Sequence, residues 1–321
     1  MIKRSKFMNK LTKVGLTALA TSLVSTASIA GELSVSGSAA LTYTGLDSAT
    51  DTNPWVMADS VKFSGSGDLD NGMTVSVYYE IDRGYTDAYD DYNLKLGMGD
   101  MGTLSFSGAS SSGSGVDSAK DIVPNAYTPV YELANENGGA TDSGLLDSSG
   151  NTQTSQWGYD VNAMGFDISV SYNAKPGTAA AAETGYSLKY SGLMDGLMLM
   201  YGAFDDGDIA ENYTYGAKYT MGNVTAAYQK TDVDYEAVAS TDEDATHMGV
   251  SVAINDDLTV SAGRQTVEFS GAAEDEENTG IQASYTMGSI SFSGGFNKVE
   301  SSGGRANIDA EASMFAASFA F

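Results

Sequence analysis

The side chains in this sequence with the greatest capacity for chemistry are its carboxylates, which gather in short acidic strings. DDGD at 205–208 and EDEEN at 274–278 are two compact examples. Because Ca²⁺ and Mg²⁺ prefer oxygen ligands, such strings predict a weak divalent-cation site. Its candidate ligands are Asp205, Asp206, Asp208, Glu274, Asp275 and Glu276. Neither string has EF-hand spacing, and the alternative is a hydrated loop in which like charges repel.

Catalytic chemistry has little support. The chain has one histidine, His247, and no cysteine, which removes Cys–His nucleophilic pairs and His-rich metal sites. No GxSxG motif accompanies the histidine, as a serine hydrolase of that type would require. A lone histidine without an assigned carboxylate partner is more often structural than a general base. We therefore predict that the protein is not an enzyme.

The charge balance excludes another class of function. The chain has 42 acidic and 16 basic residues, for a formal net charge of −26. Binding to nucleic acid phosphates needs clustered lysine and arginine, so we predict no nucleic-acid partner. Without cysteine there are no disulfides, and stability must come from burial or from a lipid solvent.

Residues 1–30 have the composition of a secretory signal peptide. Basic residues precede the apolar run Val14–Val24, and the small-residue sequence Ser28-Ile29-Ala30 follows it. The alternative, an N-terminal membrane anchor, is disfavoured because a spanning helix needs roughly 20 apolar residues. We predict cleavage after Ala30 and a mature domain at 31–321.

The rest of the chain consists of short runs in which apolar and polar residues alternate. In one example, Ile168, Val170 and Tyr172 alternate with polar residues, so one face of a strand is apolar. The runs predict sixteen strands, near residues 33–45, 60–68, 73–81, 90–98, 103–108, 155–163, 166–173, 184–192, 197–204, 212–220, 224–232, 245–254, 258–269, 278–286, 290–299 and 310–321.

The connections between these strands alternate between short and long. Seven short ones, such as LDNG at 69–72, contain Gly, Asn or Asp, which supply the positive φ angles of tight hairpins. Eight longer connections are acidic and rich in Gly and Ser. This alternation favours an up-and-down barrel with one short-turn rim over a β-sandwich.

The final strand indicates a membrane rather than water around this barrel. Phe315, Phe319 and Phe321 share one face, and large rings in such a row need an apolar medium. In a transmembrane barrel the apolar face meets lipid and the polar face lines the lumen. One strand, LMLMYGAF, is apolar on both faces, which predicts a partner inside the barrel or a neighbouring protomer.

These features together resemble the general porins of the Gram-negative outer membrane. The resemblance covers the mature chain and includes the terminal Phe and the stretches GELSVSG and LDNGMTVSVYYEID. It implies an all-β, 16-stranded antiparallel transmembrane barrel that assembles as a homotrimer in outer-membrane lipid. It also implies a water-filled channel for passive diffusion of ions and small hydrophilic solutes. Phe315, Phe319 and Phe321 are then the barrel closure and assembly signal.

The third long connection, 109–154, is the candidate constriction loop. A connection of that length needs a functional reason or is disordered. Its segment DIVPNAYTPVYEL is rich in apolar residues, which predicts packing on the inner barrel wall; the alternative is an extracellular flap. In porins, the family to which the resemblance points, the third loop folds into the pore.

Charges on the loop and wall then give a mechanism. The acidic residues Asp117, Asp121, Glu132 and Glu136 lie on the loop, and the strand positions of Lys62 and Lys95 match those of the basic wall residues of porins. Lys189 and Lys218 have the same lumen-facing parity. Opposed charges across a constriction sort solutes by charge, and the small number of basic wall residues predicts a preference for cations. The alternative is that the lysines are merely hydrated lumen residues.

A second class of function stays open from the sequence alone. The same barrel, with its lumen closed, is compatible with a structural or adhesive protein whose acidic loops bind divalent cations or a surface ligand. Ion conductance discriminates between the two interpretations.

Overall fold

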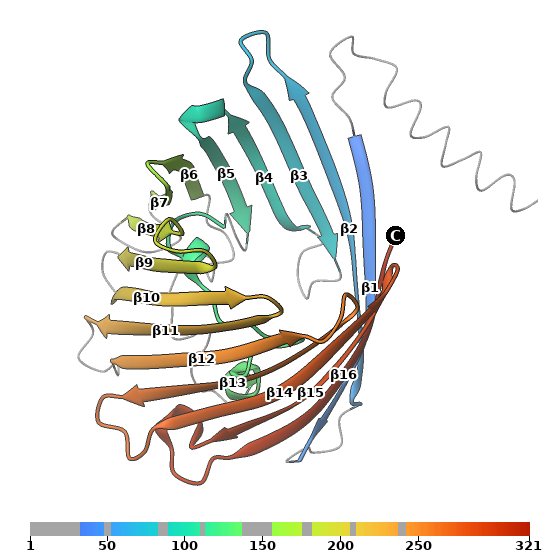
Figure 1. Cartoon of the computed structure of the whole chain (residues 1–321), viewed down its shortest axis with the longest axis vertical. Helices are drawn as coiled ribbons and strands as arrows, with labels where there is room; N and C mark the ends of the chain where they lie inside the picture. The colour runs from blue at the N-terminus through green and yellow to red at the C-terminus, as the bar shows by residue number, and fades with distance from the viewer. Residues whose placement is uncertain are drawn as a thin grey trace, which may run out of the picture.

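The computed structural model describes residues 33–47, 53–82, 89–109, 113–136, 156–174, 182–205, 210–236 and 242–321. Among these residues, sixteen strands form one closed antiparallel barrel in which each strand pairs with its neighbours in sequence, and β1 pairs with β16 (Figure 1). The strands are β1 (Leu33–Leu46), β2 (Trp55–Asp68), β3 (Thr74–Asp82), β4 (Tyr89–Gly97), β5 (Thr103–Ala109), β6 (Gln156–Ala163), β7 (Phe166–Asn173), β8 (Glu183–Tyr190), β9 (Leu197–Asp205), β10 (Ala210–Met221), β11 (Val224–Tyr235), β12 (Glu243–Ala253), β13 (Leu258–Phe269), β14 (Glu276–Met287), β15 (Ile290–Glu300) and β16 (Ala310–Ala320).

Helical structure in the described residues is limited to single turns. They are η1 (Gly99–Met101), η2 (Gly115–Ala119), α2 (Glu132–Glu136) and η5 (Ser302–Gly304). In this part of the chain, no helix is long and apolar enough to cross a membrane.

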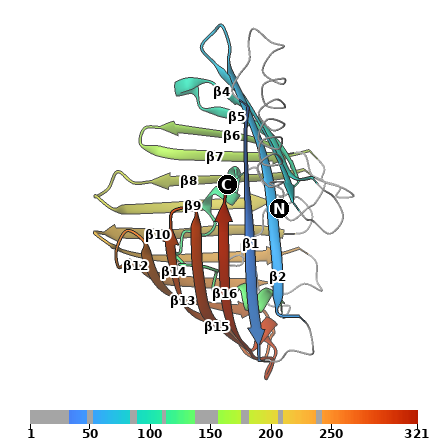
Figure 2. The same cartoon turned by 90° about the vertical axis from the view of Figure 1, so that its right-hand side faces the viewer.

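The barrel closes where the last strand meets the first, as the sequence predicted (Figure 2). Tyr43 lies opposite Phe315, and Ala39 lies opposite Phe319. The backbone of Phe321 extends the ladder: its N–H donates to the Gly37 carbonyl at 2.9 Å, and its carbonyl accepts from the Gly37 N–H at 2.8 Å. The seam is therefore hydrogen-bonded from Gly37 to Leu46 of β1.

The tight turns at one rim follow from local sequence. Between β6 and β7, Met164 and Gly165 have φ angles of 57° and 83°. Two successive positive φ angles define a type I′ hairpin, whose twist matches that of the flanking strands.

Alternation along the strands places apolar side chains on the outside of the barrel. Phe292, Phe296 and Phe315 all lie on this face with about two-fifths of their surface exposed. Aromatic residues pair across strands there, with ring centroids 5.1 Å apart for Tyr43 and Trp55 and 4.7 Å apart for Phe166 and Tyr190. The inner face instead carries buried polar residues such as Thr214, Gln229 and Gln265. The polarity is that of a barrel dissolved in lipid.

Several strands extend further than the sequence pattern indicates. β2 begins at Trp55 rather than near residue 60, because Trp55 and Met57 pair with Tyr43 and Leu41 of β1. β11 reaches Tyr235 and β14 begins at Glu276. Acidic residues that look like loop in sequence therefore belong to strand ends, and the connections between them are shorter than expected.

The lipid-facing assignment makes a direct prediction about stability. Ile281 in the middle of β14 is 59% exposed on the outer face. Ile281→Arg is expected to destabilise the barrel by about 2–4 kcal/mol, the usual cost of a lipid-facing charge near the bilayer midplane. The measurement is urea-induced unfolding in lipid vesicles.

Ser284→Arg is the matched control, because Ser284 lies on the same strand with lumen-facing parity. Its effect should be much smaller. Equal destabilisation by the two arginines would contradict the assignment of faces.

Candidate pore site

Residues 113–136 lie inside the barrel, where they run along the inner wall from the β7–β9 side to the β15–β16 side (Figure 1). This confirms the predicted inward fold of the third loop for its described part. Residues 110–112 and 137–155 lie outside the described residues. The hydrophobic core of the molecule sits between this segment and the wall, not at the barrel axis.

Glycines on the inner wall provide the space in which the segment sits. A Cβ on Gly216 of β10 would lie 2.7 Å from Ile122 Cδ1, and one on Gly249 of β12 would lie 2.7 Å from Val123 Cγ1. Gly263 and Gly280, which continue the row on β13 and β14, would each approach Val130 Cγ1 to 3.0 Å. Larger residues at these positions would push the segment into the lumen.

Methionines complete the apolar surface under the segment. Met200 of β9 packs with Ala119, Ile122 and Val123, and Met198 lies against the same group. The inward face of LMLMYGAF thus packs against the loop, one of the two partners predicted. α2 packs at the other end, where Leu133 and Ala134 contact Val299 of β15 and Ala310 and Ala312 of β16.

Side chains of the wall also hold the backbone of the segment. The amide groups of Tyr127 and Thr128 donate to Gln282 Oε1 at 2.9 and 3.0 Å. Asn297 Nδ2 donates to the Pro129 carbonyl at 3.0 Å, and the Ala126 N–H donates to Ser261 Oγ at 2.7 Å. These bonds satisfy backbone groups that would otherwise be buried without partners.

His247 belongs to this docking surface. It has 5% of its surface exposed on the inner face of β12, and the Tyr131 ring packs edge-on against it at 5.7 Å between centroids. Its surroundings are those of a packed structural residue.

The acids of the segment occupy different environments. Asp121 and Glu132 are exposed on the side away from the wall. Asp121 has a φ angle of 54° and accepts a hydrogen bond from the Tyr131 hydroxyl at 2.9 Å. Asp117 is mostly covered and pairs with Lys120 Nζ at 2.7 Å. Glu136 ends α2, and its side chain lies outside the described set.

Burial and the nearby Glu132 carboxylate raise the pKa of the Tyr127 phenol on the same segment. The phenol therefore stays neutral at physiological pH, and the carboxylates set the charge of this face.

The four predicted wall lysines all have lumen-facing parity, but they lie on two different walls. Lys62 on β2 and Lys95 on β4 face the lumen from the side opposite the docked segment. Lys189 on β8 and Lys218 on β10 belong to the wall on which the segment is docked. Of these four lysines, only Lys62 and Lys95 therefore lie across the lumen from the acids of the docked segment.

The β2–β4 wall carries acids that the sequence reasoning missed. Lys62 Nζ lies 3.2 Å from Glu80 Oε2, and the Tyr78 hydroxyl donates to the same carboxylate. Asp91 of β4 lies directly opposite Glu80. Strand parity alone places Glu80 on the lumen face, since its neighbours Tyr79 and Ile81 are apolar and face outward; this signal was available in the sequence.

A cavity of about 540 Å³ occupies the lumen beside this wall. Tyr78, Asp91, Asn93 and Lys95 line it together with serines of β1–β3 and with Gly113 at the start of the described loop segment. Hydroxyl, amide and charged groups thus surround the open part of the lumen, a surface suited to water and small polar solutes.

The candidate metal ligands are only partly brought together. Glu276 is fully buried and accepts hydrogen bonds from Asn278 Nδ2 and the Gly303 N–H, both at 2.7 Å. Glu274 accepts from Ser301 Oγ at 2.6 Å. Both carboxylates thus hold the β15–β16 connection. Within the described ranges, no three acidic or imidazole ligands converge on one point. Asp206 and Asp208 lie outside those ranges, so cation binding at 205–208 stays a prediction.

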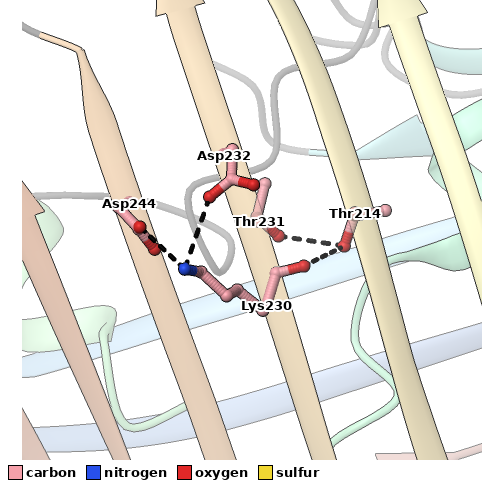
Figure 3. Close-up of polar contacts among 5 residues, drawn as sticks. All are labelled: Thr214, Lys230, Thr231, Asp232 and Asp244. Atoms are coloured by element: carbon pink, nitrogen blue, oxygen red, sulfur yellow. Dashed lines mark hydrogen bonds and ion pairs between the residues drawn. The ribbon is translucent and has the colours of Figure 1, made fainter.

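Other acids lie on the outer face of the barrel at the long-loop rim. Lys230 of β11 lies between Asp244, at 2.8 Å, and Asp232, at 3.7 Å (Figure 3). On the opposite, inner face, Thr214 and Thr231 share a hydrogen bond of 2.9 Å. Asp234 and Glu268 extend the same acidic rim. The carboxylates of this rim therefore lie outside the lumen and do not line the constriction.

A sixteen-stranded antiparallel barrel with an apolar exterior, a polar lumen and a segment docked inside it defines a channel of the outer-membrane type. The chain belongs to the Gram-negative porin family, whose model matches residues 15–321. An outer-membrane location follows from this membership and the fold. No curated protein sequence matches the chain.

Solved structures of porins share this fold at low sequence identity. OmpT, an outer membrane protein of Vibrio cholerae, is 13% identical, with a TM-score of 0.67 over 92% of this chain and 100% of that chain. A refined porin structure is 19% identical, with a TM-score of 0.67 over 90% of this chain and all of that one. A triple mutant of the Rhodopseudomonas blastica porin is 15% identical, with a TM-score of 0.61 over 90% of this chain and 100% of that chain.

The docked position of the segment can be tested with a covalent link. The chain has no cysteine, so Val123→Cys with Gly249→Cys introduces the only pair. Because the Val123 methyl lies 2.7 Å from the Cβ position of Gly249, we expect a disulfide to form under mild oxidation. In the oxidised protein the disulfide replaces the non-bonded contact that a larger residue at position 249 would otherwise make, so the segment should stay docked and the single-channel conductance should match that of the native channel.

Val123→Cys with Gly67→Cys is the control pair, because Gly67 lies on β2 with open space around its Cβ position. It should stay reduced. A conductance of the oxidised first pair far above or below that of the native channel would indicate that the segment occupies another position in the membrane.

Proposed function

We propose that this porin is a passive diffusion channel for ions and small hydrophilic solutes and that it prefers cations. The observation that carries the preference is the distribution of charge around the open lumen. Asp121 and Glu132 are exposed on the docked segment, while Lys62 across the lumen is ion-paired with Glu80. With Lys62 paired, Lys95 is the remaining predicted lysine that faces the segment across the lumen, so carboxylates outnumber basic groups in the field across the constriction.

The channel function predicts stepwise conductance when purified protein is added to a planar lipid bilayer. In a KCl gradient, the reversal potential should have the sign of K⁺ selectivity. A bilayer conductance that never rises above baseline would favour the alternative of a structural or adhesive barrel. A reversal potential with the sign of Cl⁻ selectivity would contradict the acidic filter but would leave the channel function intact.

Two substitutions test which acids form the filter. Asp121→Asn combined with Glu132→Gln should lower the K⁺/Cl⁻ permeability ratio several-fold, because it removes two exposed carboxylates from the described part of the segment. Asparagine tolerates the left-handed backbone of residue 121, so the docked conformation should persist. Asp117 is left intact because it neutralises Lys120.

Asp234→Asn combined with Glu268→Gln is the charge-matched control, since both residues are exposed at the outer acidic rim. It should leave the permeability ratio within error of the native value. If the double variant of Asp121 and Glu132 also did so, the filter would lie elsewhere in the lumen.

We further propose that the mature protein begins at Gly31 and assembles as a homotrimer. Support for cleavage comes from the composition of residues 1–30, and support for the trimer comes from family membership alone. Intact mass and chemical crosslinking of protein extracted from outer membranes test both points. A mass that retains residues 1–30, or crosslinking that yields only monomer, would contradict the respective proposal.

A further inference from the structure

A second polar recess lies on the periplasmic side of the docked segment. It has a volume of about 650 Å³, and its lining includes Asp160 of β6, Asp167 of β7, Lys189 of β8 and Ser118 of η2. Gly99 and Asp100, in the tight turn between β4 and β5, also line it. The short-turn rim of such barrels faces the periplasm, so a solute in this recess has already passed the constriction when it enters from outside.

Lys189 gives the recess an uncommitted positive charge. Asp167 lies directly opposite it in the strand register, and the charges of Asp160 and Lys218 also act on its ammonium group. Nevertheless, neither Lys189 nor Lys218 forms a hydrogen bond or an ion pair with any residue in the described ranges. Two ammonium groups thus retain their donors for a ligand.

The carboxylates of the recess are held in place by neutral donors. Asp160 accepts a hydrogen bond from Ser114 Oγ at 2.8 Å and a second from Ser169 Oγ. Asp167 accepts one from Asn162 Nδ2 at 2.7 Å. A carboxylate has about four acceptor positions, so each retains capacity for a cationic donor. Neither Asp160 nor Asp167 forms an ion pair with another described residue of the recess.

The arrangement favours one class of solute over the others. A simple anion at Lys189 must approach Asp160 and Asp167, and a simple cation at those carboxylates must approach Lys189 and Lys218. A molecule that carries an ammonium and a carboxylate satisfies both sides, and charge-assisted hydrogen bonds of this kind are the strong ones.

We propose that this recess is a binding subsite for small zwitterions of the α-amino acid class. The ligand carboxylate binds Lys189, with additional positive charge from Lys218, and the ligand ammonium binds Asp160 and Asp167. The inference rests on the proposed channel function, because a subsite on this side acts only on solutes that traverse the lumen.

Solute flux into vesicles that contain the mature porin tests the subsite. Glycine is the probe. Acetate and methylammonium each carry one of its two charges, and acetamide is a neutral analogue. Flux of labelled glycine should saturate with concentration, because a bound solute must leave before the next one enters. Flux of the other three should rise linearly over the same range.

Lys189→Gln should raise the glycine concentration at half-saturation about ten-fold or more, the expected loss for one hydrogen bond to a charged group. Lys298→Gln is the matched control, since Lys298 lies on the outer face between Glu300 and Glu311. Its half-saturation should equal that of the native protein.

Linear glycine flux through the native channel would overturn the proposal, as would an unchanged half-saturation for Lys189→Gln. Saturation by acetate alone or methylammonium alone would replace it with a simple anion or cation site. In each case acetamide still permeates, so the channel function survives. Loss of acetamide flux as well would contradict the channel function itself.

Discussion

The structure depends on one constraint, which is that every backbone N–H and C=O within the hydrocarbon of a bilayer must find a partner in the protein. A sheet meets this constraint only when it closes, and the pairing of β1 with β16 closes it. The two bonds between Gly37 and Phe321 carry the ladder to the last residue of the chain. The polarity of the side chains follows, because lipid on one face and water on the other sort each strand by its alternation.

A closed barrel with a polar interior has no apolar core at its centre, and this shapes how the constriction segment is held. The segment brings its own apolar residues, and the wall accommodates them with glycines and two methionines rather than with large side chains. Where the segment has no regular structure of its own, Gln282 and Asn297 take the place of a neighbouring strand as hydrogen-bond partners. Among the described residues, the docked segment narrows the lumen from the side of β7–β16, and one open part of the lumen borders β1–β4.

The sequence was sufficient for the strands and for the inward fold. Period-two alternation identified all sixteen strands, and the apolar stretch around Ile122 and Tyr131 was enough to predict packing on the inner wall. It was not sufficient for the choice of wall, because lumen-facing glycines occur on many strands and only the three-dimensional path selects among them. The pairing of Lys62 with Glu80 depends on the register between β2 and β3, which the alternation of side chains within each strand does not specify. Likewise Glu276, which looks like a loop ligand in sequence, is buried because β14 begins earlier than its hydrophobic pattern indicates.

The way in which the segment is fastened separates two properties that are usually coupled. Gln282, Asn297 and Ser261 bind its backbone, and its branched side chains Ile122, Val123 and Val130 fill the glycine row. Asn125, by contrast, is exposed on the segment. An exposed residue of this kind can be exchanged while the hydrogen bonds from Gln282, Asn297 and Ser261 and the packing on the glycine row are kept. A lineage of such proteins can therefore change what it admits through single substitutions while its fold remains unaltered, and the same positions are the natural ones at which to engineer a pore with a chosen permeability.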